Sequence, residues 1–420
     1  MNKVKGTYDV LPNESKMWQA LEKKIAQLME RYNYKEIRTP MMEYSEVFHR
    51  QSEGSDMVTK ETYDFLDRSD RKLTLKPEGT AGVIRSFVEN KLYVGNDVVK
   101  LYYIQPNFRY ERPQKGRYRQ FMQFGVEAIG IRSPLLDAEV VSIAYNFIKI
   151  LGLKGAKIKI NTLGDKTSRT NYLEALKAYF EPHREVLSYD SKVRLDKNPL
   201  RILDSKDEND IKLVKDAPTP LEYLTDDAKN YFDDVLKYLD SANIDYEISP
   251  RLVRGLDYYS HVVFEVEADI EGFGAQNVLG GGGRYESLVE ELGGPSLGGI
   301  GIAFGLERIL LALEAEHINL ASEDAIDAYF IVFDEAHKKH AFSYAEMLRA
   351  NDIRVEFDFK KTSFKNQLKR ALKLNSKYLL ILGEDEINQG TITVKNTVTE
   401  TQESIKQNDL LTYLKEKLGE

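Results

Sequence analysis

Residues 108–120 form a polar stretch, FRYERPQKGRYRQ, between two strand-like runs. Glu111 is its one acid, and its basic residues are Arg109, Arg112, Lys115, Arg117 and Arg119. Arginine forms bidentate pairs with phosphate and carboxylate groups. A loop in which arginines alternate with tyrosines and a glycine therefore suits a polyphosphate or the end of a nucleic acid. The alternative is a solvated, charged hairpin loop.

The strand-like run after this loop separates polar from apolar side chains. Because side chains alternate between the two faces of a strand, Gln123, Gly125 and Glu127 share one face. Phe124 and Val126 then lie on the other face. A carboxylate and an amide beside a glycine would form a floor for a small polar ligand. A Glu127 that simply faces solvent is the alternative.

Two predicted helix starts carry further residues that could bind a ligand. Glu78, Gly79 and Thr80 occupy a turn before a helix over 81–89, where carboxylate and hydroxyl oxygens would hold an ammonium group. Helix capping by Thr80 is the alternative. Arg308 lies near the start of a helix over 305–316, and the backbone at a helix N-terminus already favours anions.

Two segments combine glycine with arginine or tyrosine. Residues 252–260, LVRGLDYYS, contribute Arg254, Tyr258 and Tyr259. Residues 280–283 are four glycines, followed by Arg284 and Tyr285. This run matches neither G-x-G-x-x-G between a strand and a helix nor a loop ending in G-K-[ST], so dinucleotide-binding and P-loop sites are excluded there. Four glycines do allow the backbone to approach a ligand closely.

Lysines recur every four residues on a predicted helix over 363–374. Lys365, Lys369 and Lys373 would form a stripe along one helix face. The stripe is either an ordinary solvated face or a nucleic-acid contact whose affinity falls as the salt concentration rises.

The composition limits the class of protein that positions these residues. A length of 420 residues predicts two or three domains. The net charge of −8 argues against a protein that coats nucleic acid nonspecifically. The absence of cysteine excludes disulfides, thiolate metal sites and cysteine nucleophiles. No apolar run is long enough for a membrane span, and we expect a cytoplasmic protein with no metal site made by its own side chains.

The hydrophobic pattern predicts two kinds of architecture. In the first part we expect a helix over 14–34, extended chain over 34–42 ending near Pro40, a hairpin of strands 98–104 and 121–129, a helix over 137–151, a mostly helical insertion over about 166–246 and a strand over 262–266. A boundary follows at about 320–326. Alternating strands and helices after it predict a small, mostly parallel sheet covered by helices.

In their order along the chain, these segments resemble bacterial-type histidyl-tRNA synthetases, a family of class II aminoacyl-tRNA synthetases. The resemblance starts with KGTYDVLP over 5–12 and continues through the helix–strand element ending at Pro40. FRYERPQKGRYRQFMQ resembles the second class motif, and GIGIAFGLERIL the third. RGLDYYS and GGGGRYESL resemble the two histidine-specific motifs.

The resemblance implies an α+β fold. It implies an antiparallel sheet flanked by helices with a helical insertion, over 1–322, and a C-terminal α/β anticodon-binding domain over 326–420. It also implies a homodimer with the first class motif at the interface. The implied reaction joins L-histidine to tRNA(His) at the cost of ATP, with Mg²⁺ accompanying the nucleotide.

The same resemblance assigns roles to individual residues. For histidine it implies Glu78, Gly79, Thr80, Gln123, Glu127, Tyr258, Tyr259 and Tyr285. Arg109 and Arg254 would hold the substrate carboxylate and the α-phosphate as the catalytic pair. Arg117 and Arg308 would bind the other phosphates of ATP. Contacts to tRNA would come from Arg112 and Gln114 in the loop and from Lys365, Lys369 and Lys373.

Two alternatives stay open. A synthetase-like regulatory subunit activates ATP phosphoribosyltransferase in bacteria, but it lacks the anticodon domain and has degraded motifs. Another class II synthetase, for threonine or proline, would share only the second and third motifs. The intact RGLDYYS and GGGGRYESL segments favour histidine.

Overall fold

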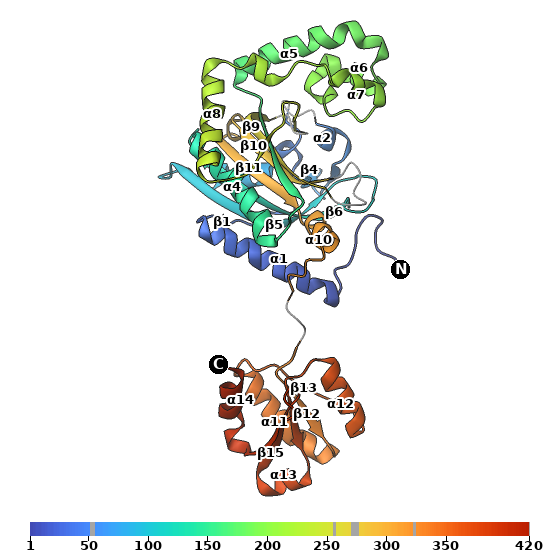
Figure 1. The fold of residues 1–420 in the computed structure, drawn as a ribbon. Helices are drawn as coiled ribbons and strands as arrows, with labels where there is room; N and C mark the ends of the chain where they lie inside the picture. The colour runs from blue at the N-terminus through green and yellow to red at the C-terminus, as the bar shows by residue number, and fades with distance from the viewer. Residues whose placement is uncertain (51–54, 255–257, 270–276, 322–324, 420) are drawn as a thin grey trace. The chain divides into compact units, whose positions relative to one another are not determined.

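The computed structural model divides the chain into two compact units, Met1–Ala321 and Ser322–Glu420 (Figure 1). It describes residues 1–50, 55–254, 258–269, 277–321 and 325–419. The middle of the RGLDYYS segment, 255–257, lies outside the described residues, as does part of the predicted boundary, 322–324. Among the described residues, no helix is long and apolar enough to cross a membrane.

The first unit is built on an eight-stranded sheet in the order β1-β5-β6-β11-β10-β9-β7-β8. Its strands are β1 (Lys35–Glu36), β5 (Val98–Phe108), β6 (Gln120–Gly130), β7 (Ala156–Thr162), β8 (Glu247–Ile248), β9 (Tyr259–Ala268), β10 (Val278–Tyr285) and β11 (Gly298–Gly305). The central pairings are antiparallel, and the outermost pair at each edge is parallel. The predicted hairpin is confirmed and is longer than expected, from Val98 opposite Gly130 to Phe108 opposite Gln120.

Helices cover both faces of this sheet (Figure 1). The helices are α1 (Pro12–Arg31), α3 (Thr80–Glu89), α4 (Pro134–Leu151), α8 (Asp226–Ser241), α9 (Leu288–Glu291) and α10 (Leu306–Ala315). One face packs its apolar side chains, such as Phe124 and Phe304, against α1, α4, α8 and α10. The other face packs against α3 and α9 and includes Tyr103, Tyr259 and Tyr285. This second face therefore carries tyrosine hydroxyl groups among its packed side chains.

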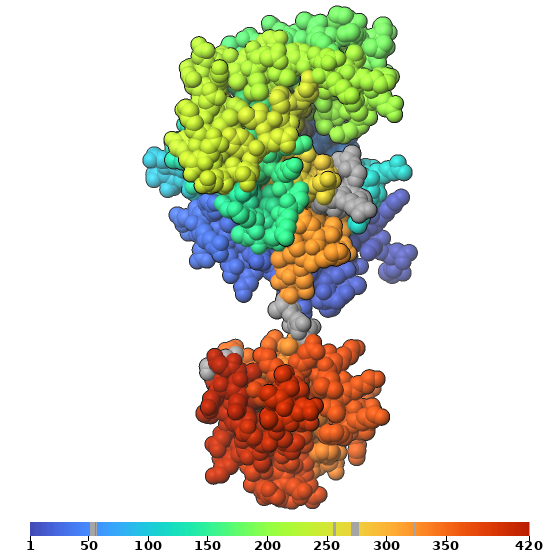
Figure 2. All heavy atoms as spheres, viewed as in Figure 1, coloured from blue at the N-terminus to red at the C-terminus, as the bar shows by residue number. Residues whose placement is uncertain are grey.

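The segment after β7 is helical, as its sequence predicts. Before α8 it contains α5 (Lys166–Phe180), α6 (Tyr189–Lys197) and α7 (Glu208–Val214). Tyr172, Leu176 and Phe180 of α5 form a separate small core with Leu195 and Ile202. Figure 2 shows this segment in green as a continuous surface layer of the first unit.

A second, three-stranded sheet has the order β2-β4-β3. Its strands are β2 (Met42–Tyr44), β3 (Tyr63–Leu66) and β4 (Lys72–Leu75), and the short helix α2 (Asp56–Lys60) precedes β3. β4 leads directly into the 76–80 turn and α3. This small sheet therefore links the segment around Pro40 to the turn that carries Glu78 and Thr80.

The second unit contains a five-stranded sheet in the order β13-β12-β14-β15-β16. Its elements are β12 (Ala328–Val332), α11 (Lys338–Arg349), β13 (Val355–Phe357), α12 (Phe364–Lys373), β14 (Tyr378–Leu382), α13 (Glu384–Gln389), β15 (Thr391–Asn396), β16 (Gln402–Lys406) and α14 (Leu410–Leu418). The expectation of a mostly parallel sheet is wrong, because only half of the strand pairings are parallel. β12 pairs in parallel with β13 and β14, but β15 pairs antiparallel with β14 and β16, because the short connections after β14 reverse the chain direction.

Candidate functional site

A cavity of about 250 Å³ lies on the face of the large sheet that α3 covers. Polar side chains from β6, β9, β10, the β5–β6 loop, the 76–80 turn and α10 converge on it. The predicted site residues that line it are Glu78, Thr80, Arg109, Arg117, Gln123, Glu127, Arg254, Tyr258, Tyr259, Tyr285 and Arg308. Residues far apart in the sequence are thus brought together at one place.

Glu127 forms the floor of the cavity and is 1% exposed. Its carboxylate accepts hydrogen bonds from Thr80 Oγ1 at 2.7 Å and from the Tyr285 hydroxyl at 2.8 Å. Burial raises the pKa of Glu127 to about 8, although the hydrogen bonds from Thr80 and Tyr285 oppose this rise. Gly301 on the neighbouring strand leaves room for this carboxylate, because a Cβ there would lie 2.2 Å from Glu127 Oε2. The floor therefore presents a carboxyl group held in one orientation.

Glu78 organises the turn before α3. Its carboxylate accepts hydrogen bonds from the backbone N–H of Thr80 at 2.6 Å and of Ala81 at 2.8 Å. Glu78 thus caps the helix, and the alternative in which Thr80 is the cap is wrong, because the Thr80 hydroxyl instead donates to Glu127. Gly79 does not line the cavity: it makes room for Tyr103, since a Cβ there would lie 2.3 Å from the Tyr103 ring.

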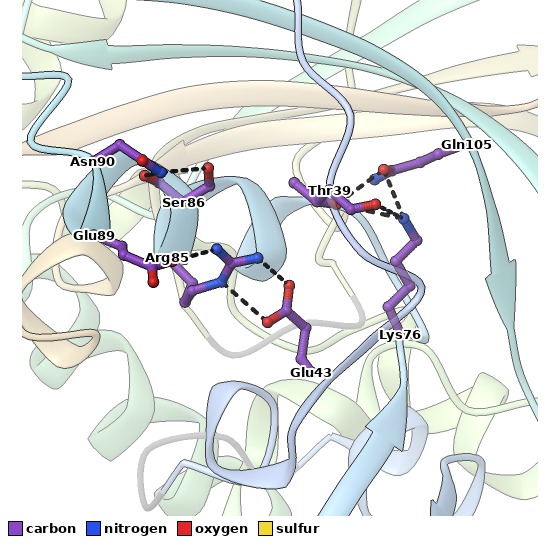
Figure 3. A network of polar contacts seen from close by, with 8 residues as sticks. All are labelled: Thr39, Glu43, Lys76, Arg85, Ser86, Glu89, Asn90 and Gln105. Carbon is purple, nitrogen blue, oxygen red and sulfur yellow. Dashed lines mark hydrogen bonds and ion pairs between the residues drawn. The ribbon is translucent and has the colours of Figure 1, made fainter.

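A buried network holds this turn in place (Figure 3). Lys76 is 1% exposed, and its ammonium group donates to Gln105 Oε1 at 2.7 Å and to the carbonyl oxygen and Oγ1 of Thr39 at 3.3 and 3.4 Å. Arg85 of α3 donates to Glu43 of β2 at 2.5 and 3.0 Å. The segment around Pro40, strand β5 and the turn are therefore connected by buried polar contacts.

Three arginines come from the β5–β6 loop and α10. Arg109 donates to the carbonyl oxygen of Pro77 at 2.8 Å and lies over the Phe121 ring. Arg117 forms an ion pair with Glu111. Arg308 donates to the carbonyl oxygens of Gly116 and Val278 at 3.1 and 2.8 Å. Burial and the neighbouring Arg117 lower the pKa of Arg308, which an incoming anion would reverse.

Aromatic side chains close another side of the cavity. The rings of Tyr258 and Tyr259 lie 4.7 Å apart between centroids, and Tyr258 meets Tyr285 edge-on at 5.9 Å. Burial raises the pKa of Tyr259 to about 12, so this phenol stays protonated at neutral pH. The ring cluster lines the cavity with phenol groups that can donate and accept hydrogen bonds, and Tyr285 already donates to Glu127.

Some predicted residues lie elsewhere. Arg112 and Gln114 are exposed in the loop and do not line the cavity, and Gln114 pairs with Arg117 across the turn at Gly116. The lysines of α12 belong to the second unit, and all three are exposed: Lys365, Lys369 and Lys373.

Sequence reasoning did not assign several cavity residues, namely Glu111, Tyr118, Phe121 and Glu307. All four lie in the segments 108–123 and 301–310, so their proximity in sequence to Arg109, Arg117 and Arg308 is the signal that points to them. Glu307 accepts hydrogen bonds from the Tyr8 hydroxyl at 2.5 Å and the Met122 backbone N–H at 2.7 Å. This ties the N-terminal segment to the start of α10.

The second unit exposes aromatic side chains beside its cations. Phe333, which follows β12, is 50% exposed and stacks on Phe364 at 5.7 Å. Phe359, which follows β13, is 79% exposed. Lys360 and Lys361 follow directly, and both are exposed. Aromatic rings interleaved with cations are typical of surfaces that bind single-stranded nucleic acid.

Taken together, the cavity can hold a molecule with N–H groups against Glu127 and anionic groups against the arginines. The chain has no cysteine, and the cavity offers no histidine among its described lining residues. The arginines and carboxyl groups of the cavity suit a reaction assisted by positioning and charge stabilisation.

Comparisons with known proteins agree with this chemistry. The family profile "Histidyl-tRNA synthetase" matches residues 6–165, and the profile "Anticodon binding domain" matches residues 327–417. The chain is 58% identical to the histidine–tRNA ligase of Acholeplasma laidlawii, over 99% of both chains.

Solved structures show the same relationship. The apo histidyl-tRNA synthetase of S. aureus is 40% identical, with a TM-score of 0.85 over 99% of this chain and 100% of that chain. A Bacillus halodurans structure, described as an ATP phosphoribosyltransferase regulatory subunit/histidyl-tRNA synthetase, is 20% identical with a TM-score of 0.65 over 91% of this chain and 98% of that chain. At that identity it shows the fold alone. The full-length identity to curated ligases means that the chain belongs to the histidyl-tRNA synthetase family.

Proposed function

We propose that this chain is a histidine–tRNA ligase, which activates L-histidine with ATP and transfers it to the 3′ end of tRNA(His). The observation that supports this most directly is the buried Glu127 carboxyl, with its Thr80 and Tyr285 partners, in one cavity with four arginines. The regulatory alternative is less favoured, because relatives at 47–58% identity over nearly the full length carry the ligase name.

Histidine has three groups to recognise, and the cavity offers a partner for each, with Arg109 and Arg254 for the carboxylate. Glu127 and the surrounding phenols would bind the imidazole. Glu78, Thr80 and Gln123 would bind the α-amino group; Gln123 Oε1 already accepts a hydrogen bond from Asn107 at 2.5 Å. Buried polar groups left unpaired by a wrong substrate would give discrimination of about 10⁴-fold or more.

In the first step, a histidine carboxylate oxygen attacks the α-phosphorus of ATP, and pyrophosphate leaves. Negative charge builds up at this phosphoryl group. Arg109 and Arg254 would stabilise that charge, while Arg117 and Arg308 would hold the departing phosphates. No side chain has to become bonded to the substrate. In the second step, the terminal tRNA hydroxyl attacks the adenylate and AMP leaves.

Mg²⁺ would accompany ATP. Among the described residues, no group of three or more potential side-chain ligands is poised to hold a metal ion. The cavity does contain the carboxylates Glu111 and Glu307. This donor set suits an ion bound mainly by phosphates and water with one or two carboxylates. The bound ion would neutralise phosphate charge beyond what the arginines provide.

The tRNA would contact both units. Arg112 and Gln114, exposed at the loop tip, would reach the acceptor end. In the second unit, 326–420, Lys365, Lys369 and Lys373 would bind the tRNA backbone, and Phe333 and Phe359 offer faces on which bases stack. Since translation uses charged tRNA in the cytoplasm, we place the protein there.

We further propose a homodimer. One face of the small sheet carries Met42 and Tyr44 of β2, with Phe65 of β3 in the same cross-strand row as Tyr44. These three side chains are 52%, 50% and 42% exposed. An outward-facing apolar sheet surface of this kind is typical of a protein interface.

The first test is ATP–pyrophosphate exchange with each of the twenty amino acids separately, which needs no tRNA. Exchange with histidine alone would support the proposed function. Exchange with another amino acid would keep a synthetase but exclude histidine as its substrate. If no amino acid supports exchange, the proposal is wrong and the regulatory alternative is favoured.

The tRNA step is tested by reversing the charge of Lys365, Lys369 and Lys373 together. We expect the KM for tRNA to rise, more at low salt than at high salt, while histidine-dependent exchange is unchanged. Val398→Ala, an exposed apolar change on the β15–β16 turn, is the matched control. An unchanged KM for tRNA would assign the α12 lysines to an ordinary solvated face.

A further inference from the structure

The guanidinium of Arg254 lies directly over Gly281 of β10. A Cβ at Gly281 would come within 2.5 Å of Cζ, Nη1 and Nη2 of Arg254. Such a distance is shorter than any van der Waals contact, so a side chain at position 281 would displace the guanidinium. The fourth position of strand β10 therefore has no room for a side chain, because the Arg254 guanidinium occupies the space above it.

The strand register places a carboxylate beside this position. Glu265 of β9 is the cross-strand partner of Gly281, and Arg254 Nη1 forms an ion pair with its carboxylate. Both side chains are largely buried, with 19% of Arg254 and 13% of Glu265 exposed. Arg254 lines the cavity, whereas Glu265 does not. Glu265 thus contacts the arginine from behind the site.

Other charges near Glu265 already have partners. Glu267, two residues along β9, forms an ion pair with Lys159 of β7 at 2.7 Å. Burial raises the pKa of Glu265, and the adjacent Arg254 counteracts that rise. Among the described residues, Arg254 is the cation that Glu265 contacts in an ion pair. The pair therefore forms a local unit rather than part of an extended surface network.

We propose that Glu265 and Gly281 are positioning residues for Arg254: Gly281 provides the space that the guanidinium occupies, and Glu265 fixes its orientation. This inference rests on the proposed function, in which Arg254 stabilises charge at the α-phosphate. A guanidinium carries five N–H donors in a fixed fork, and the ion pair uses the Nη1 side. Its Nε is buried and has no hydrogen-bond partner among the described residues, so the ion pair with Glu265 is the contact that orients the guanidinium.

The physical benefit is preorganisation. An unrestrained arginine would sample many rotamers and would have to be ordered in each turnover. An arginine already held by a carboxylate stabilises developing charge without that reorganisation. A displacement of about 1 Å at such a group can cost about 10²-fold in rate.

The experiment measures histidine-dependent ATP–pyrophosphate exchange for Glu265→Gln, Gly281→Ala, Arg254→Ala and the double variant Glu265→Gln/Arg254→Ala. We expect each single variant to lower kcat, Glu265→Gln by about tenfold to 10²-fold, with a smaller change in the KM for histidine. The decisive prediction is non-additivity: in the Arg254→Ala background, Glu265→Gln should have no further effect.

Glu267→Gln is the matched control, because it removes a carboxylate from the same face of the same strand without touching Arg254. It should leave kcat unchanged. Thermal unfolding of every variant shows whether the fold is kept; if Glu265→Gln does not fold, Gly281→Ala tests the same arrangement with Glu265 intact.

Full activity of Glu265→Gln, or additive losses in the double variant, would overturn the inference. The proposed function fails in a different way, because wild-type protein would then show no exchange with histidine.

Discussion

At the residue scale, Glu127 is an acid that its surroundings keep partly protonated. Burial raises its pKa from the ordinary 4.5 to about 8. Between these values the folded protein binds more protons at this group than the unfolded chain does, so the free energy of unfolding falls as pH rises. The slope is at most about 1.4 kcal/mol per pH unit. We expect Glu127→Gln to remove this slope, so that its stability relative to wild type increases from pH 5 to pH 8.

Denaturant unfolding of both proteins at a series of pH values measures this difference. Above pH 8 the difference should level off, because the carboxyl is then ionised in both states. Glu286→Gln, which changes a carboxyl that is 41% exposed, is the control for removing one carboxyl group. A stability difference that is constant from pH 5 to pH 8 would contradict the raised pKa.

The sequence predicts Glu127 as a site residue, but it does not predict the residues that position Arg254. Strand alternation is a local rule, so Gln123 and Glu127 could be placed on one face in advance, and the structure puts both in the cavity. Glu265 stands eleven residues from Arg254, and its role depends on the register between β9 and β10. Register is set by packing across strands, which a single sequence does not reveal.

At the scale of elements, the 76–80 turn depends on the buried ammonium of Lys76. Burial lowers the pKa of Lys76 to about 8, while the carboxylates of Glu43 and Glu78 favour its charged form. Lys76→Met keeps a similar length but leaves the oxygens of Thr39 and Gln105 without their donor. We expect a loss of about 1–3 kcal/mol in stability and a higher KM for histidine, because Glu78 and Thr80 lie in this turn.

Thermal unfolding and the exchange assay measure the two effects. Lys72→Met is the matched control, because Lys72 is exposed at the other end of β4 and should tolerate the change. A Lys76→Met protein with wild-type stability and an unchanged KM for histidine would show that the network in Figure 3 does not hold the turn.

Element prediction succeeded where local signals were strong. The long hairpin has two runs of strand-forming residues around a polar loop, and α4 has apolar residues at helical spacing. The sequence therefore predicts both elements. β16, with the sequence QESIK, has a mostly polar and exposed pattern and was missed. β7, whose lysines alternate with buried isoleucines, was also missed, and its place in the sheet is fixed by pairing with β9.

At the scale of the whole molecule, charge is distributed unevenly. The net charge is −8, yet the cavity gathers four arginines and α12 exposes three lysines. An acidic average disfavours nonspecific adhesion to nucleic acid, and the basic groups are concentrated at these two places. Composition gives the average charge but cannot locate these basic sites, which depend on the fold.

In the small sheet of the first unit, buried side chains are polar and exposed ones are apolar, which is the reverse of the usual arrangement. The row Glu43–Thr74–Asp64 is polar, and Glu43 and Thr74 are buried. The row Tyr44–Leu73–Phe65 is apolar, and Tyr44 and Phe65 are exposed. Exposing apolar area costs about 25 cal/mol per Å², so covering this face by a second copy would be favourable.

We therefore expect Tyr44→Asp/Phe65→Asp to convert a dimer into a monomer, because each interface would bury two charges of one sign from each copy. Sedimentation equilibrium should give twice 48.2 kDa for wild type and 48.2 kDa for the variant. Val186→Asp, which changes another exposed apolar residue in the helical insertion, should remain dimeric. Because the same segment reaches Lys76 and Arg85 through Thr39 and Glu43, the monomer should also lose histidine-dependent exchange. A wild-type monomer would contradict the proposed dimer, and a variant that stays dimeric would mean that the dimer forms through a different surface.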